Sequence, residues 1–149
     1  MLIHVIGYGN PGRRDDGLGV ALAAEIESLA LHGVTADSDY QLNVEYSADI
    51  CSVDVVVFAD ASVNAPEPFE FTRIQPAREI TFTTHSVSPA SVLAVCQDIY
   101  GRCPEAYQLA VRGYSFELGE GLTEEAMGNL RRAVEFLSGF ITEKLQSIP

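Results

Sequence analysis

A glycine-rich loop at residues 7–20 links a predicted strand to a predicted helix, and it constrains the fold more than any other segment. Leu2 to Ile6, just before the loop, forms a short apolar run typical of a strand. After the loop, apolar residues recur at helical spacing, which predicts a helix from about Gly17 to Leu31. In an open α/β sheet such a loop lies at the carboxyl end of its strand, where ligands bind.

Two kinds of ligand compete for this loop. Gly7, Gly9 and Gly12 match the G-x-G-x-x-G pattern of dinucleotide-binding folds. Pro11 removes one amide donor, however, and Asp15-Asp16 places negative charge where a phosphate would lie. The sequence also predicts no acidic residue about 20 residues on, at the tip of a second strand. We therefore expect a cation here, with helix capping as the alternative role of either aspartate.

Length and charge limit the classes of function. The chain has 149 residues, of which 47% are hydrophobic, as expected for one domain spanning 1–149. Its 21 acidic and 9 basic residues give a formal net charge of -12. Because such a surface repels nucleic acids and anionic membranes, we expect neither as a partner; a basic or metal-bearing partner suits it better.

Neither export nor disulfide bonding is indicated. The N-terminus starts with a strand and lacks the basic and apolar segments of a signal peptide, so we expect a cytoplasmic chain. No apolar stretch approaches the length of a membrane span. Cys51, Cys96 and Cys103 are odd in number and lack C-x-x-C spacing, which argues against a disulfide framework and a thiolate zinc site.

Four further strands follow from the pattern of apolar residues. Val34 to Tyr40 is polar and is expected to be a loop, whereas Gln41 to Tyr46 alternates as a strand does. Val53 to Ala59 is apolar at nearly every position, which is typical of a central strand covered on both faces. Phe69 to Ile74 is predicted at an edge of the sheet, and Tyr107 to Val111 completes the set.

Later helices carry clear start signals. Ser88 is expected to cap a helix whose first residue is Pro89, and Thr123 to cap the last helix. The order of strands and helices predicts an α/β fold with three layers, α/β/α. Its sheet is expected to be twisted and mainly parallel, with about five strands and helices on both faces.

Three polar residues are predicted to meet at one edge of this sheet. Asp60 directly follows the central strand, on the same edge as Asp16 if the first and third strands are parallel neighbours. His85 lies in a loop of small hydroxyl side chains, just ahead of the helix at Pro89. Two carboxylates and a neutral imidazole form a donor set suited to a divalent transition metal. For Asp60, the termination of a strand is the alternative role.

The chain resembles the hydrogenase maturation endopeptidases over most of its length. The resemblance is carried by Ile6-Gly7-Tyr8-Gly9-Asn10, followed by Asp15-Asp16-Gly17-Leu18-Gly19. Further matches, in the order of the family, are Phe58-Ala59-Asp60-Ala61, the His85 loop before a helix, and Gly121-Leu122-Thr123. It implies an enzyme that trims the C-terminus of a nickel-iron hydrogenase large-subunit precursor.

The same resemblance implies roles for the three residues. Asp16, Asp60 and His85 match the family positions associated with nickel, and they are the expected catalytic and metal-binding residues. The nickel is expected to arrive with the precursor, and not to be held permanently by the protease, which we expect to be a monomer. Peptide hydrolysis then follows if the metal polarises the scissile carbonyl or activates water. Asp16 is either a ligand or a general base.

One departure and two alternatives accompany this interpretation. Many family members carry a Gly-Gly-Thr turn after the second strand, where this chain has Val44-Glu45-Tyr46-Ser47-Ala48-Asp49. A non-catalytic maturation chaperone that binds nickel or the precursor is one alternative function. The other is a nucleotide-binding oxidoreductase, which rests on the glycine pattern alone. A covalent serine or cysteine protease is disfavoured, because the sequence shows no nucleophile elbow or activated cysteine.

Overall fold

The structure is a computed structural model that describes residues 1–78 and 87–147. Within these residues, five strands form one sheet in the order β2-β1-β3-β5-β4. Neighbouring strands are parallel, except that β4 runs antiparallel to β5. The elements in chain order are β1 (Ile3–Tyr8), η1 (Arg14–Gly17), α1 (Leu18–Ser28), β2 (Val34–Asp39), α2 (Tyr46–Ile50), β3 (Val55–Ser62), β4 (Phe69–Ile74), α3 (Pro89–Tyr100), β5 (Glu105–Arg112) and α4 (Glu124–Gln146).

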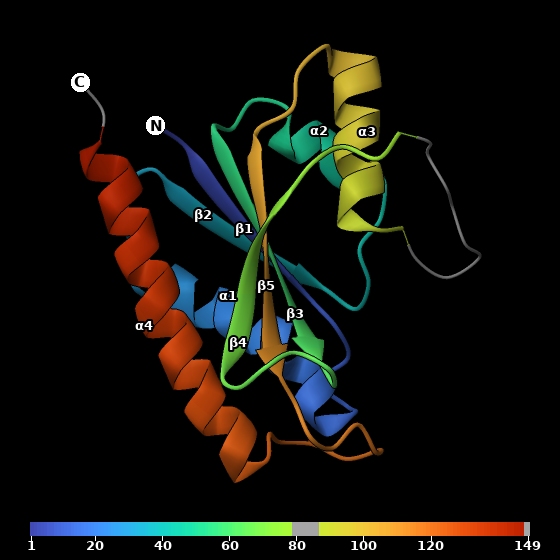
Figure 1. Cartoon of the computed structure of the whole chain (residues 1–149), viewed down its shortest axis with the longest axis vertical. Coiled ribbons are helices and arrows are strands. Elements are labelled where there is room, and N and C mark those ends of the chain that lie inside the picture. Colours follow the sequence, from blue (N-terminus) through green and yellow to red (C-terminus); the bar gives the residue numbers. More distant parts are fainter. Residues whose placement is uncertain (79–86, 148–149) are drawn as a thin grey trace.

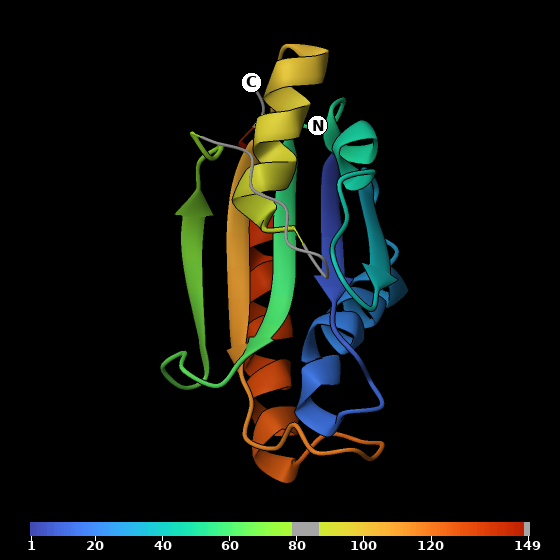
Figure 2. The same ribbon diagram turned by 90° about the vertical axis from the view of Figure 1, so that its right-hand side faces the viewer.

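Helices cover both faces of the sheet (Figure 1). The core on one face is shared with α1 and α4, and the core on the other face with α2 and α3. Figure 2 shows the strands side by side, with α3 in front of the sheet and α4 behind it. The predicted three-layer α/β/α fold with a mainly parallel sheet is therefore confirmed.

The central strand β3 is buried on both faces, as its sequence predicts. Val55 and Val57 pack into the core beneath α1 and α4, whereas Val56 and Phe58 pack into the core beneath α2 and α3. All four side chains are at most 2% exposed. A strand that contributes to two cores must be apolar at successive positions, and this produces the uninterrupted run in the sequence.

The second strand lies earlier in the chain than the sequence pattern predicts. Residues 34–39 pair in parallel with β1 as strand β2, so the expected loop at Val34 to Tyr40 is wrong. This strand lies at the edge of the sheet, and its residues outside Val34 and Ala36 are exposed. An edge strand buries few side chains, so its polar sequence carries little of the alternation that identifies a strand.

The predicted strand from Gln41 to Tyr46 is also wrong. The segment is irregular and leads into the short helix α2. Leu42, Tyr46 and Ile50 are buried at a spacing of four residues, while Val44 is 38% exposed. A spacing of four residues is compatible with the two-residue period of a strand and with one turn of a helix. A strand that buries Leu42 and Tyr46 would also bury Val44, so the exposure of Val44 indicates the helical period.

Two glycines allow the backbone of α1 to pack very close to the backbone of β1 and β3. A Cβ atom built on Gly7 in β1 would lie 1.9 Å from the carbonyl oxygen of Gly19 in α1. A Cβ atom on Gly19 would lie 2.4 Å from the carbonyl oxygen of Ala59 in β3. Neither position can carry a side chain in this arrangement. The glycines therefore bring the start of α1 against the carboxyl ends of β1 and β3.

Two backbone amides at the C-terminal end of the exposed edge of β2 are bonded to carboxylates of the same segment. The carbonyl oxygens of Gly33 and Asp39 accept hydrogen bonds from the β1 segment. Because the backbone groups of successive residues in a strand point to opposite sides, those of Ser38 and Tyr40 point away from β1. The amide of Ser38 donates to the Asp37 carboxylate at 2.8 Å, and the amide of Tyr40 donates to Asp39 at 2.7 Å.

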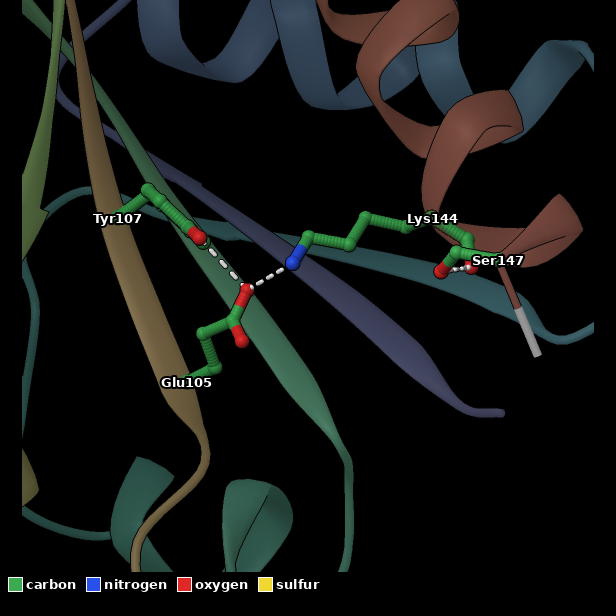
Figure 3. A network of polar contacts seen from close by, with 4 residues as sticks. All are labelled: Glu105, Tyr107, Lys144 and Ser147. Carbon is green, nitrogen blue, oxygen red and sulfur yellow. Dashed lines mark hydrogen bonds and ion pairs between the residues drawn. The ribbon is translucent and has the colours of Figure 1, made fainter. Parts of the chain in front are cut away.

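The far end of α4 is tied to β5 by a polar network (Figure 3). The Glu105 carboxylate accepts a hydrogen bond from the Tyr107 hydroxyl at 2.6 Å and forms an ion pair with Lys144. The Tyr107 ring stacks on Phe71 of β4 with 4.9 Å between centroids, and Phe140 of α4 meets it edge-on. These contacts hold the C-terminal helix over the β4–β5 side of the sheet.

Across the described residues, none of the helices is both long enough and apolar enough to cross a membrane.

The two predicted N-caps are confirmed. The Ser88 hydroxyl accepts a hydrogen bond from the amide of Ser91 at 3.1 Å, and the Thr123 hydroxyl accepts one from the amide of Ala126 at 3.2 Å. Both are the amide three residues on, as expected of N-cap side chains.

Candidate active site

A cavity of about 490 Å³ opens at the carboxyl ends of β1 and β3. From β1 the chain continues to β2 on one side, whereas β3 lies on the other side, so the sheet has its topological switch point here. Ligands of open α/β sheets bind at such points. Residues 40–42 and 87–89 contribute to the wall, together with Tyr8, Gly9, Asp16, Asp60 and Gln108.

Asp16 reaches this cavity from the one-turn helix η1. One of its carboxylate oxygens, Oδ2, accepts a hydrogen bond from the amide of Asn10 at 2.8 Å. The backbone of Asp16 lies so close to Gly9 that a Cβ atom on Gly9 would be 2.0 Å from the Asp16 carbonyl oxygen. Gly9 also has a φ of 139°, which side-chain-bearing residues rarely adopt. The loop therefore requires glycine at this position.

Asp60 reaches the same cavity from β3, as the sequence predicts. The strand does not end before it: β3 continues to Ser62, and Asp60 still pairs with Ala110 of β5. The ladder to β1, however, ends one residue earlier, at the pair of Gly7 and Ala59. Asp60 therefore lies just beyond the point where β1 and β3 part, and its side chain lines the opening between them.

The electrostatics of Asp60 reflect its burial and its neighbour. Burial raises the pKa of the Asp60 carboxyl, and the negative charge of Asp16 raises it further. Hydrogen bonds from the Ala61 amide and the Tyr8 hydroxyl oppose this, and the pKa is about 7. Asp16 is thus close enough to Asp60 for its charge to disfavour the ionised form of the Asp60 carboxyl.

Sequence reasoning missed two polar residues of the cavity, Tyr8 and Gln108. The Tyr8 hydroxyl donates a hydrogen bond to Asp60, and the side-chain amide of Gln108 lies 3.5 Å from the Tyr8 oxygen. Burial raises the pKa of Tyr8, and the charge of Asp60 adds to the effect, so the hydroxyl keeps its proton. Tyr8 is the last residue of β1, and its place at a strand end was the signal available in the sequence.

His85, the third predicted residue, lies outside the described residues. Within 1–78 and 87–147, no group of three or more histidine, cysteine, aspartate or glutamate side chains is placed to hold a metal ion. Of the predicted trio, the structure therefore brings Asp16 and Asp60 to one cavity. Two carboxylates in one cavity suit a divalent cation that has further ligands from elsewhere.

Asp15 has a structural role different from helix capping, the alternative role that its sequence position suggests. Its carboxylate makes no capping bond to η1 or α1, and its side chain is fully buried. It accepts hydrogen bonds from the segment that follows β5, at Tyr114, Ser115 and Thr123. Burial raises the pKa of Asp15, but these hydrogen bonds more than offset that effect, so the pKa lies below its ordinary value.

The glycine-rich loop has no amide left for a pyrophosphate. Each residue from Gly9 to Asp16 except Pro11 donates its amide hydrogen bond within the chain. The amide of Asn10, for example, is taken by Asp16, and that of Gly12 by the Asn10 side chain. Dinucleotide-binding loops need free amides that face the phosphates. The glycines serve close packing and a left-handed backbone instead.

Solved structures of other proteins share this fold over almost the whole chain. The chain matches the hydrogenase maturating endopeptidase HybD from Escherichia coli with a TM-score of 0.74 and 25% identity, over 97% of this chain and 94% of that chain. A solution structure of an endopeptidase from Escherichia coli gives the same TM-score, identity and coverage. The chain has the fold of the hydrogenase maturation endopeptidases. The resemblance inferred from the sequence is thereby confirmed.

A third match extends the likeness beyond one organism. The NiFe hydrogenase maturation protease HycI from Thermococcus kodakarensis shares the fold with a TM-score of 0.74 and 24% identity, over 95% of this chain and 92% of that chain. Searches against protein-family models and against curated proteins gave no significant match.

The departure from the pattern of the hydrogenase maturation endopeptidases can now be placed in the fold. Because β2 ends at Asp39, the turn after the second strand is Tyr40-Gln41-Leu42, and the predicted position at 44–49 is wrong. These three residues line the cavity beside Asp16 and Asp60. Asp39 itself is an acidic residue at a strand tip that sequence reasoning missed. Its carboxylate accepts hydrogen bonds from the Tyr40 amide and the Tyr46 hydroxyl.

Proposed function

We propose that this chain is an endopeptidase that removes the C-terminal extension of a nickel-iron hydrogenase large-subunit precursor after nickel insertion. The observation that carries the proposal is the convergence of Asp16 and Asp60 on one cavity at the switch point of the sheet. The solved structures with this fold include proteins named as hydrogenase maturation proteases and endopeptidases.

In this proposal, nickel is part of the substrate. Asp16, Asp60 and His85 bind the nickel that the precursor carries, and the precursor supplies the remaining ligands. Asp16 and Asp60 repel one another across the cavity, so a divalent cation placed between them relieves the repulsion. A precursor without nickel lacks this attraction, which makes cleavage depend on completed metal insertion.

The chemical step is hydrolysis of one peptide bond. A water oxygen attacks the scissile carbonyl carbon, the carbon–nitrogen bond breaks, and the leaving amine takes a proton. Nickel supplies Lewis-acid chemistry, by polarising the carbonyl or activating the water. Asp16 either holds the metal or accepts the proton of the water. The Tyr8 hydroxyl orients the Asp60 carboxylate through its hydrogen bond.

The experiment incubates the purified chain with two samples of large-subunit precursor, one loaded with nickel and one without. Mass spectrometry follows the loss of the C-terminal extension. We expect cleavage of the nickel-loaded precursor only. A stable complex with no loss of mass would instead support a maturation chaperone. Saturable binding of a dinucleotide, measured by calorimetry, would favour the oxidoreductase alternative.

We further propose that the protein works in the cytoplasm as a monomer. The acidic composition, with a formal net charge of -12, supports a partner with a basic docking surface. Gel filtration of the free protein and of its mixture with the precursor tests both the monomer and the partnership. A self-associated species at micromolar concentration would contradict the first, and separate elution of the two proteins would contradict the second.

A further inference from the structure

The carboxylate of Asp15, the residue before Asp16, lies where two distant parts of the chain meet. Asp15 in η1 is 0% exposed. Its Oδ2 atom accepts hydrogen bonds from the amides of Tyr114 and Ser115, at 2.8 and 3.1 Å, and from the Thr123 hydroxyl at 2.8 Å. Its Oδ1 atom accepts the amide of Thr123 at 2.8 Å. Four donors thus hold one carboxylate across about a hundred residues of sequence.

The charge of Asp15 is balanced by hydrogen-bond donors and a helix end. Among residues 1–78 and 87–147, no lysine, arginine or histidine forms an ion pair with it. Thr123 is the N-cap of α4, and its hydroxyl both donates to Asp15 and accepts from the Ala126 amide. Asp15 therefore lies at the positive end of a 23-residue helix, where a negative charge is stabilised.

The backbone of η1 is held to the same segment. The amide of Asp15 donates to the Ser115 carbonyl at 2.9 Å, and the amide of Arg14 donates to the Gly119 carbonyl at 3.0 Å. The amide of Gly119 donates in return to the Gly12 carbonyl at 2.9 Å. The one-turn helix thus has little freedom to slide along the segment after β5.

Asp15 and Asp16 are consecutive residues of this 3-10 turn, so their side chains leave it about 120° apart. When Asp15 points into the protein interior, Asp16 points toward the cavity, where Oδ2 accepts the Asn10 amide. A rotation of η1 that released Asp15 would swing Asp16 away by a similar angle. The two orientations are therefore coupled through the turn.

We infer that Asp15 is a positioning residue, whose anchorage to Tyr114, Ser115 and the N-terminus of α4 sets the direction in which Asp16 presents its carboxylate. This inference rests on the proposed function insofar as it assigns Asp16 a role in cleavage. It makes the first turn of α4 part of the support of the site, although α4 contributes no residue to the cavity lining. Misplacement of a reacting group by about 1 Å can reduce a rate about 10²-fold.

The test compares Asp15→Asn and Thr123→Val with Thr123→Ser. Asparagine replaces one acceptor oxygen by an NH₂ group that faces other donors, and valine removes the hydroxyl donor, whereas serine retains it. The first readout is the Asn10 amide in ¹H–¹⁵N NMR spectra of the folded proteins, because this amide reports its hydrogen bond to Asp16. We expect its signal to move in the Asn and Val variants and to stay in place with serine.

The second readout is turnover of the nickel-loaded precursor. We expect kcat to fall at least tenfold in Asp15→Asn with little change in KM, and Thr123→Ser to retain the wild-type rate. Ile141→Val is the matched control, because it removes a buried methyl group from α4 far from Asp15. It should lower stability while leaving the Asn10 signal and kcat unchanged.

Two results would overturn the inference. One is an unchanged Asn10 signal and an unchanged kcat in both folded variants, Asp15→Asn and Thr123→Val. The other is an equal displacement of the Asn10 signal by Ile141→Val, which would show a general effect of destabilisation. If the wild-type protein does not cleave the precursor, the proposed function fails, while the NMR comparison still decides whether Asp15 orients Asp16.

Discussion

The hydroxyl of Tyr8, the last residue of β1, donates a hydrogen bond to the carboxylate of Asp60 in β3. The bond crosses the point where the two strands part, so one strand orients a functional group carried by the other. Gln108 of β5 lies 3.5 Å from the same hydroxyl, which brings a third strand to the site. Three of the polar side chains of the cavity are therefore carried by strands, which hold side chains more rigidly than loops do.

Replacement of Tyr8 should test this arrangement directly. Tyr8→Phe removes the donor to Asp60 and keeps the ring, so we expect precursor cleavage to slow about tenfold, as for other residues that orient a metal ligand. Initial rates with nickel-loaded precursor provide the measurement. The control is Tyr100→Phe in α3, where the tyrosine is 45% exposed and outside the cavity lining. Equal rates for both variants and the wild type would show that the hydrogen bond is dispensable.

The two carboxylates of the cavity should matter far more than other aspartates. We expect Asp16→Asn and Asp60→Asn each to reduce cleavage at least about 100-fold, because each removes a charge that the substrate's nickel would meet. The fold should survive, since neither change removes core volume. Asp98→Asn, on the exposed side of α3, provides the matched control. Retention of normal cleavage by either cavity variant, in a folded protein, would remove that residue from the site.

Two glycines should respond to alanine in opposite directions. At Gly9 the added Cβ atom would meet the Asp16 carbonyl at 2.0 Å with φ at 139°, so we expect the free energy of unfolding to fall by about 2–4 kcal/mol. At Gly139, in α4, the space is open, and alanine should raise stability by about 0.5–1 kcal/mol. Urea unfolding of both variants measures the difference. A stable Gly9→Ala protein would mean that the loop can adopt another path.

Removal of Lys144 should weaken the protein in a pH-dependent manner. The hydrogen bonds from Lys144 and Tyr107 lower the pKa of Glu105, which is 4.5 in its ordinary state. A lowered carboxyl pKa stabilises the fold above that ordinary value, and the contribution disappears as the pH falls through the lowered pKa. We expect Lys144→Met to cost about 0.5–1 kcal/mol of unfolding free energy at neutral pH.

This difference between wild type and Lys144→Met should shrink as the pH falls through the lowered pKa of Glu105, because the carboxyl is then protonated in both proteins. It should also shrink at high pH, because the hydrogen bond to Glu105 raises the pKa of Lys144 and its stabilisation is lost as the pH rises through that raised value. Urea unfolding across the pH range measures this. Lys144→Arg keeps the charge and should follow the wild type. A difference that stays constant with pH would assign the effect to packing.

The sequence predicted the parts of the fold that bury apolar side chains. The run from Val53 to Ala59 identified the central strand because that strand contributes to two cores, and Asp60 followed from its end. Residues 34–39 escaped prediction because an edge strand buries few side chains. Its extended conformation depends on pairing with the neighbouring strand and leaves little trace in its own sequence. The role of Asp15 was equally hidden, since its partners lie about a hundred residues further along the chain.

The sequence predicted only those residues of the site that lie beside a strong local pattern. Asp16 and Asp60 stand beside strong local signals, a glycine-rich loop and the end of a buried strand, so a parallel sheet was sufficient to bring them together. The only local signal for Tyr8 is its place at the end of β1, and Gln108 becomes visible only when the strand register is known. His85 lies outside the described residues and stays a prediction.

Among residues 1–78 and 87–147, β2 pairs with β1 alone, and its free side has a consequence for behaviour in concentrated solution. The exposed edge of a sheet offers amides to which a strand of another copy could add, and proteins block such edges with charge or self-satisfaction. Here Asp37 and Asp39 do both, because each carboxylate holds the amide of the next residue and adds negative charge beside the edge. An incoming strand would have to displace these bonds and approach an acidic surface. The edge strand nearest the cavity is thus guarded against aggregation by the same two aspartates that made its sequence look like a loop.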